Sequence, residues 1–101
     1  MSDPHEPQLY LISYDIRDDG RWRKVYKAMR GQGDRVQYSV FRCVLTEKRL
    51  AALVGKLSAA ISPTEDQVLI VPLGSADAPR SWQMETLGLP LTAPEKVVNV
   101  F

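Results

Sequence analysis

The chain has 101 residues, a formal net charge of +1, 45% hydrophobic residues and 25% charged residues, which is ordinary for one globular domain. Its one cysteine, Cys43, excludes an intramolecular disulfide and a cysteine-based zinc site, and its one histidine, His5, has no partner histidine. No apolar stretch approaches the roughly 20 residues that a membrane span needs and no signal peptide is visible, so we expect a cytoplasmic protein without membrane contacts.

Residues 1–8 are polar, and we expect them to form a flexible leader. A strand is predicted from about Leu9 to Ile16, because a run of aromatic and branched apolar residues bounded by a turn cluster is typical of a buried strand. Asp15 lies at its end, where a carboxylate on a rigid element can face solvent and suits a metal site or proton transfer. Aspartates at such positions more often bond backbone amides of the next turn, and that alternative stays open.

A helix is predicted from about Gly20 to Arg30, after the capping residues Asp18 and Asp19. Helical spacing gives it one apolar stripe, which consists of Trp22, Val25, Tyr26 and Met29. A second face carries basic residues and no acid, namely Arg23, Lys27 and Arg30. Such a face is either simply solvated or contacts phosphates.

The segment from Arg35 to Leu45 is rich in β-branched and aromatic residues. It predicts two strands, or one strand with a bulge or tight reversal near Tyr38–Ser39. Thr46 caps a second helix that ends by Pro63, with an apolar stripe of Leu50, Leu53, Val54, Leu57 and Ile61. A strand from Gln67 to Leu73 follows, and Pro72 favours an edge position for its end.

Residues 9–73 therefore predict an α+β domain of the ferredoxin-like βαββαβ type, with an antiparallel sheet and both helices on one face. The other face would be bare in a monomer although its strands are apolar, so we expect a homodimer. Residues 74–101 are expected to form a C-terminal loop and an extra strand, Lys96 to Phe101, which packs on the dimer partner.

Two blocks in this order resemble a known family: Tyr14-Asp15-Ile16, and then Arg35-Val36-Gln37-Tyr38-Ser39-Val40-Phe41. The similarity runs from about Tyr10 to Leu73. It is to the small CRISPR-associated adaptation protein, the second core CRISPR protein and the partner of the CRISPR integrase. Arg42 departs from the family pattern, because an acid often follows the phenylalanine.

The resemblance implies a ferredoxin-like homodimer with magnesium-dependent endonuclease activity on RNA or DNA. It implies that Asp15 is the catalytic residue and the metal ligand, and that four residues support it: Tyr14, Arg35, Ser39 and Phe41. We add four candidates for nucleic-acid binding, which are Arg17, Arg23, Lys27 and Arg30.

The residues by themselves leave the activity open. Magnesium binds one or two carboxylates with waters and phosphates, so one Asp15 per chain is a thin site unless the two copies meet near a two-fold axis. No histidine is available as a general base, so hydrolysis would depend on the metal. Tyr14, Phe41 and Trp22 are more often core residues than base-stacking platforms. The alternative function is a non-catalytic homodimeric DNA-binding scaffold for the integrase, and a regulatory or RNA-binding domain is the third hypothesis.

Overall fold

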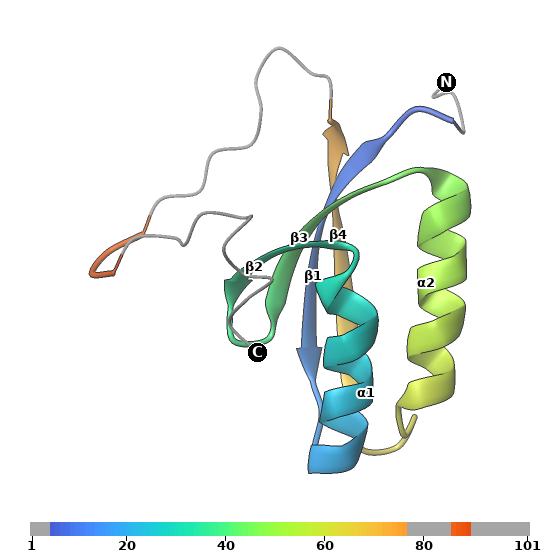
Figure 1. Cartoon of the computed structure of the whole chain (residues 1–101), viewed down its shortest axis with the longest axis vertical. Helices are drawn as coiled ribbons and strands as arrows, with labels where there is room; N and C mark the ends of the chain where they lie inside the picture. The colour runs from blue at the N-terminus through green and yellow to red at the C-terminus, as the bar shows by residue number, and fades with distance from the viewer. Residues whose placement is uncertain (1–4, 77–85, 90–101) are drawn as a thin grey trace.

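The computed structural model describes residues 5–76 and 86–89, and in this part the chain forms a four-stranded antiparallel sheet covered by two helices (Figure 1). The order along the chain is β1 (Gln8–Asp15), α1 (Asp19–Arg30), β2 (Gly33–Gln37), β3 (Val40–Leu45), α2 (Glu47–Ala60) and β4 (Gln67–Ser75). The strand order across the sheet is β2-β3-β1-β4. This is the ferredoxin-like βαββαβ arrangement predicted from the sequence. No helix in this part of the chain has the length and apolar character to cross a membrane.

Strand β1 lies inside the sheet, between β3 and β4. It pairs with β3 from Gln8 opposite Leu45 to Ser13 opposite Val40, and with β4 from Gln8 opposite Ser75 to Asp15 opposite Gln67. Both helices lie on the same side of the sheet (Figure 1). Because side chains alternate along a strand, each strand sends one set toward the helices and the other toward the open face.

The core lies between the sheet and the helices. Ile12, Phe41 and Cys43 contribute from the strands, and they pack against Val25 and Met29 of α1, each with no exposed surface. Burial raises the pKa of the Cys43 thiol to about 12, so Cys43 is a small apolar core residue. The stripe predicted on α1 is confirmed, since Trp22 packs against this core and Val25, Tyr26 and Met29 lie in it.

The stripe predicted on α2 was only partly right. Leu53 and Leu57 are buried, but Val54 keeps 38% of its surface exposed because it points away from the sheet. Ile61 lies past the last helical residue, Ala60, and is the extended C-cap. Thr46 is the predicted N-cap, and its side chain accepts from the Arg49 amide.

The first strand begins and ends one residue earlier than expected, since β1 spans Gln8–Asp15 and leaves Ile16 in the following turn. Part of the expected leader is bonded to the end of β4. The Ala76 amide donates to the Pro7 carbonyl at 3.1 Å, and the Ser75 hydroxyl donates to Glu6 at 2.8 Å. Strand β4 itself continues to Ser75, beyond the expected boundary at residue 73.

The two-strand prediction for Arg35 to Leu45 is confirmed, with Tyr38 and Ser39 forming the turn. At the start of β2, a Cβ on Gly33 would collide with the Arg42 carbonyl oxygen and would lie 2.8 Å from the Cys43 sulfur. A glycine is therefore needed there for the close approach of β2 to β3. Pro72 lies in β4, an edge strand, where a missing amide donor is tolerated.

The open face of the sheet carries apolar side chains. Val44 on β3 keeps 50% of its surface exposed and Leu69 on β4 keeps 55%. Leu11 on β1 and Val71 on β4 lie opposite each other in the sheet, and both are partly buried. The predicted C-terminal strand, residues 96–101, lies outside the described residues.

A buried carboxylate joins the loop after β1 to the loop before β4. The Asp66 side chain has no exposed surface. Its Oδ1 accepts from the Arg17 amide at 2.9 Å, and its Oδ2 accepts from Arg21 Nε and the Ser62 amide, both at 2.7 Å. The Arg21 guanidinium also reaches Glu65 at 2.8 Å. Charge-assisted bonds of this kind are the strong ones, so Asp66 fixes the start of α1 against the end of α2.

The Asp66 contacts predict a stability change in acid. The hydrogen bond from Arg21 and the amides of Arg17 and Ser62 hold the pKa of the Asp66 carboxyl far below its ordinary value of 3.8. Stability from a depressed carboxyl pKa is complete above the unfolded-state value and is lost as the pH falls below it. Thermal melts should therefore show a steep loss of stability below about pH 4.

The Asp66→Asn variant should melt at a lower temperature than the parent at pH 7 and show a shallower loss below pH 4. Asp19→Asn is the control, because Asp19 is an exposed residue in the first turn of α1. Equal acid sensitivity in the parent and in Asp66→Asn would contradict the role given to Asp66.

Candidate active site at the end of the sheet

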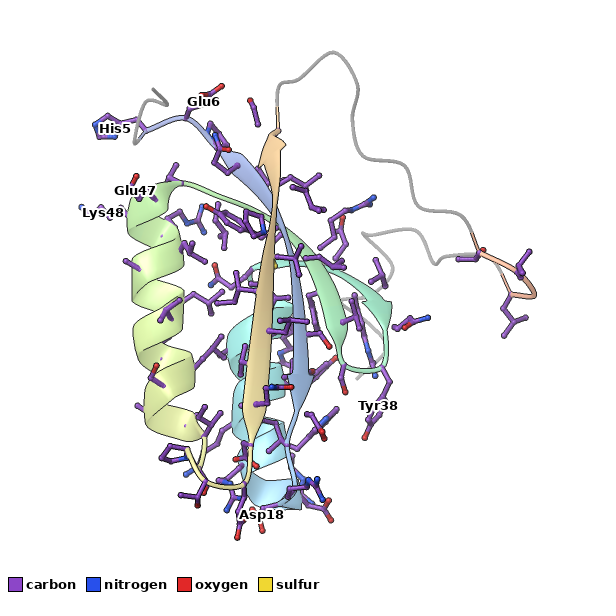
Figure 2. The ribbon with its side chains drawn as sticks, turned by 180° about the vertical axis from the view of Figure 1, so that it is seen from behind. His5, Glu6, Asp18, Tyr38, Glu47 and Lys48 are labelled. Carbon is purple, nitrogen blue, oxygen red and sulfur yellow. The ribbon has the colours of Figure 1, made fainter. Side chains whose placement is uncertain are left out.

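One end of the sheet gathers the residues singled out in the sequence. Asp15 ends β1, the Tyr38–Ser39 turn joins β2 to β3, and Asp18 caps α1. Figure 2 shows Tyr38 and Asp18 toward this end and His5 and Glu6 toward the opposite end. Since His5 is the only histidine of the chain, no imidazole stands near Asp15.

Asp15 is exposed, and its carboxylate makes no hydrogen bond or ion pair with any other residue that the structure describes. Its neighbour Tyr14 points into the core, so alternation directs Asp15 toward the open face. The alternative that Asp15 bonds the backbone of the next turn is therefore not seen. That capping role belongs to Asp18, which accepts from the Arg21 amide at 2.9 Å.

The segment after Asp15 is held in place by the Asp66 contacts. The Arg17 amide, two residues beyond Asp15, donates to Asp66, and Arg21 lies one turn further. The Arg17 side chain itself is exposed. Asp15 is thus free at its carboxylate but fixed through its backbone, a combination suited to binding a ligand.

No group of three or more histidine, cysteine, aspartate or glutamate residues is placed to hold a metal among the described residues. Within residues 5–76 and 86–89, Asp15 is thus the predicted ligand without a cluster of further acids around it. Magnesium usually keeps several waters and binds one or two carboxylates together with substrate phosphates. The fit is thus limited to a site that a second Asp15 or a bound phosphate completes.

Tyr14 and Phe41 are core residues in this structure. Tyr14 is 3% exposed and Phe41 has no exposed surface, and their rings stack at 6.3 Å. Burial raises the pKa of the Tyr14 hydroxyl to about 12. This hydroxyl and Trp22 Nε1 are buried without a hydrogen-bond partner in the described part of the chain. Tyr14 and Phe41 therefore belong to the hydrophobic core and do not form part of an exposed site.

Ser39 and Arg35 lie near the same end. The Tyr14 amide donates to the Ser39 carbonyl at 3.0 Å, which places the β2–β3 turn beside the last residues of β1. The Arg35 guanidinium lies 5.3 Å from the Tyr26 ring centre and 5.4 Å from that of Tyr38, which are cation–π contacts. Arg42, the departure from the family pattern, pairs with Asp34 across β2 and β3 at 3.4 Å.

Sequence reasoning missed an aromatic stack at this turn. Trp22 lies 5.2 Å from Tyr26 and 5.0 Å from Tyr38 between ring centres, and both pairs are stacked. Tyr38 is 67% exposed. The available signal was the predicted reversal at Tyr38–Ser39, because an aromatic residue in a turn is placed outside both faces of the sheet.

The basic face of α1 forms as predicted. Arg23, Lys27 and Arg30 are exposed, and none forms an ion pair with another described residue. Lys24 beside them is exposed as well. These charges lie in the helix layer, whereas Asp15 ends a strand, so the structure does not gather them around the carboxylate. They form a second, separate candidate surface for phosphates.

Known proteins resemble this chain in sequence and in fold. The family described as CRISPR associated protein Cas2 matches residues 8–80. The CRISPR-associated endoribonuclease Cas2 of Geobacter sulfurreducens is 42% identical over 69 residues, which are 68% of this chain and 73% of that protein. The protein of the same name from Thermus thermophilus is 40% identical over 83 residues, 81% of this chain and 88% of the relative.

Solved structures agree with this similarity. A hypothetical protein from Thermus thermophilus superposes with a TM-score of 0.71 at 35% identity, covering 84% of this chain and 96% of its own. Cas2 of Streptococcus pyogenes, crystallised at pH 6.5, gives a TM-score of 0.68 at 30% identity over 79% of this chain and 99% of its own. The family match over most of the domain, the relatives and the shared fold together show that this chain belongs to the Cas2 family of CRISPR-associated proteins.

Proposed function

We propose that this chain is a homodimeric endonuclease of CRISPR adaptation that hydrolyses phosphodiester bonds in RNA or DNA, with Asp15 as the residue that binds magnesium. The observation that carries the proposal is the free, exposed carboxylate of Asp15 on a backbone fixed by Asp66. Relatives at 42% and 40% identity that are named endoribonucleases support it.

Asp15 would hold the metal together with a second carboxylate from the other protomer or with substrate phosphates. When bound there, magnesium would polarise a phosphate and lower the pKa of a nearby water. The chain's own residues bind and orient the nucleic acid. Arg17 and Arg35 bring positive charge to the same end of the sheet, where it can offset charge on the reacting phosphate.

The supporting residues act on the position of Asp15. Tyr14 and Phe41 fill the core beneath it, and the Ser39 carbonyl holds the Tyr14 amide. The Ser39 hydroxyl is not proposed as a nucleophile, because no histidine can activate it. A substitution at one of these residues that shifts Asp15 by about 1 Å would slow the reaction, although the residue itself does not touch the substrate.

The apolar open face supports the homodimer. Val44, Leu69 and their neighbours form an unpartnered patch on the face opposite the helices. A second copy of this chain is the occupant that satisfies two-fold symmetry and brings a second Asp15 to the assembly. Residues 96–101 are proposed to add to the partner's sheet.

A second candidate function is favoured by the basic face of α1. This face carries four exposed cations that form no ion pair with a described residue, and such charges suit contact with a phosphate backbone. They are Arg23, Lys24, Lys27 and Arg30. In this version the chain is a non-catalytic dimer that binds duplex DNA and docks the CRISPR integrase in the cytoplasm. The two versions differ in whether Asp15 takes part in turnover.

The Asp15→Asn variant tests the nuclease. It keeps the shape and removes the ligand charge, so cleavage of RNA and DNA in magnesium should be abolished while stability changes by less than about 1 kcal/mol. Cleavage and binding should be measured together, with magnesium and with a chelator. Asp19→Asn should cleave like the parent.

Cleavage that survives in Asp15→Asn would remove Asp15 from the centre of the reaction. If neither protein cleaves and both bind DNA, the scaffold is the function. In that case Asp15→Asn should bind at least as tightly as the parent, because a carboxylate near phosphates repels them without a metal.

Charge on the open face tests the dimer. Sedimentation at micromolar concentration should show the dimer mass for the parent chain, since stable interfaces bury more than about 1,000 Å². Val44→Lys and Leu69→Lys should weaken association about 100-fold or more, because each buries an unpaired charge. Val54→Lys is the matched control on the outer side of α2 and should leave the dimer intact. A parent that sediments as a monomer would overturn the interface.

Charge reversal on α1 tests the second surface. Changing Arg23, Lys27 and Arg30 to Glu should weaken duplex binding and flatten its salt dependence by roughly one unit per lost phosphate contact. The same charge change on α2, at Lys48, Arg49 and Lys56, is the matched control. Equal losses in both triple variants would show an effect of net charge and return the α1 residues to a solvated face.

A further inference from the structure

An exposed aromatic ring stands at the tip of the β2–β3 hairpin. Tyr38 keeps 67% of its surface exposed, whereas Tyr14 and Tyr26 are buried and Tyr10 is partly buried. Figure 2 shows its side chain pointing outward from the hairpin end. A single exposed apolar side chain is common on protein surfaces. What suits this ring to binding is its support by Trp22 and Arg35 and its place beside the last residues of β1.

The ring is held from behind. Its plane lies 20° from that of Trp22, which in turn stacks on Tyr26 at an angle of 4°. Tyr26 is 7% exposed and belongs to the core. The Arg35 guanidinium contacts the rings of both Tyr26 and Tyr38. The exposed ring is thus the outer member of a stack rooted in α1, which limits the freedom that it would lose on binding.

The stack lies close to Asp15 in the fold. Ser39, the residue after Tyr38, accepts from the Tyr14 amide, and Tyr14 precedes Asp15. Trp22 also contacts the Tyr14 ring at 6.2 Å. A nucleotide resting on Tyr38 would therefore place its phosphates near Arg35 and near the end of β1.

We propose that Tyr38 is a stacking platform for one unpaired base of a nucleic acid bound beside Asp15, with Arg35 meeting the adjoining phosphate. The inference rests on the proposed function and adds a specificity-determining residue to it. Every base has a π-face, so such a platform tolerates any sequence. Bases inside a duplex are already stacked on their neighbours, so the platform selects single-stranded segments.

The test measures binding without turnover. The full chain carrying Asp15→Asn is titrated into a labelled single-stranded oligonucleotide of mixed sequence and, separately, into a blunt-ended duplex of two complementary strands, with chelator present. Tyr38→Ala and Tyr38→Leu should weaken single-strand binding about 5- to 100-fold, because base–aromatic stacking is lost in both. Tyr38→Phe and Tyr38→Trp keep an aromatic ring and should bind like the Tyr38 parent. Duplex binding should stay within about twofold.

The salt dependence separates stacking from charge. Loss of a stacked base lowers affinity without changing the slope of log K against log salt, because no phosphate contact is removed. Tyr38→Ala should therefore give a line parallel to that of its parent. Three results would each overturn the proposal. Tyr38→Ala could lose as much affinity for the duplex as for the single strand, Tyr38→Ala could bind the single strand as tightly as its parent, or Tyr38→Leu could keep full single-strand affinity. A change in dimer mass in Tyr38→Ala would likewise assign the ring to the protein interface.

The outcome is separable from that of the nuclease proposal. If the parent chain cleaves nothing, the binding affinities of the Tyr38 variants still test the stacking platform. If cleavage depends on Asp15 and magnesium while Tyr38→Ala binds like its parent, the platform alone fails.

Discussion

The ion pair between Asp66 and Arg21 is the constraint on which the functional end of the molecule depends. Four donor contacts reach one buried carboxylate, and they come from the loop after β1, from α1 and from the end of α2. An ion pair without exposed surface on its acid needs every bond satisfied to be stable, and here both oxygens are. The cost of removing any partner keeps the segment after Asp15 in one position.

That anchoring explains how one residue can be free and still well placed. Asp18 and Asp66 take the capping and bridging roles that carboxylates usually fill near turns. Asp15 is left without a partner among the described residues, on a strand bonded along both edges. Because Asp18 caps the helix and Asp66 bridges the loops, the carboxylate of Asp15 is available to a ligand.

Both helices lie on one face of the sheet, and this separates the two candidate binding surfaces. Because α1 and α2 cover the same face, the positive charges of α1 and the apolar patch around Leu69 lie in different layers (Figure 1). A nucleic acid along α1 and a protein partner on the open face would not compete. The β2–β3 hairpin lies at the end of the sheet, where the Tyr38 stack and Asp15 can serve the same bound strand.

The sequence by itself determined the fold class and the two helices with their caps, because each depends on local pattern: alternation, helical spacing and capping residues. It left two alternatives for Arg35 to Leu45, and the family followed from the resemblance of two short blocks of residues. It also singled out Asp15 and the acid-free face of α1. Only the tertiary structure decided that Asp15 lacks a partner in the described residues, that Asp66 fixes its neighbours, and that Trp22 and Arg35 support Tyr38. These facts join residues far apart in the chain, such as Arg21 and Asp66, and local pattern carries no information on which distant side chains meet.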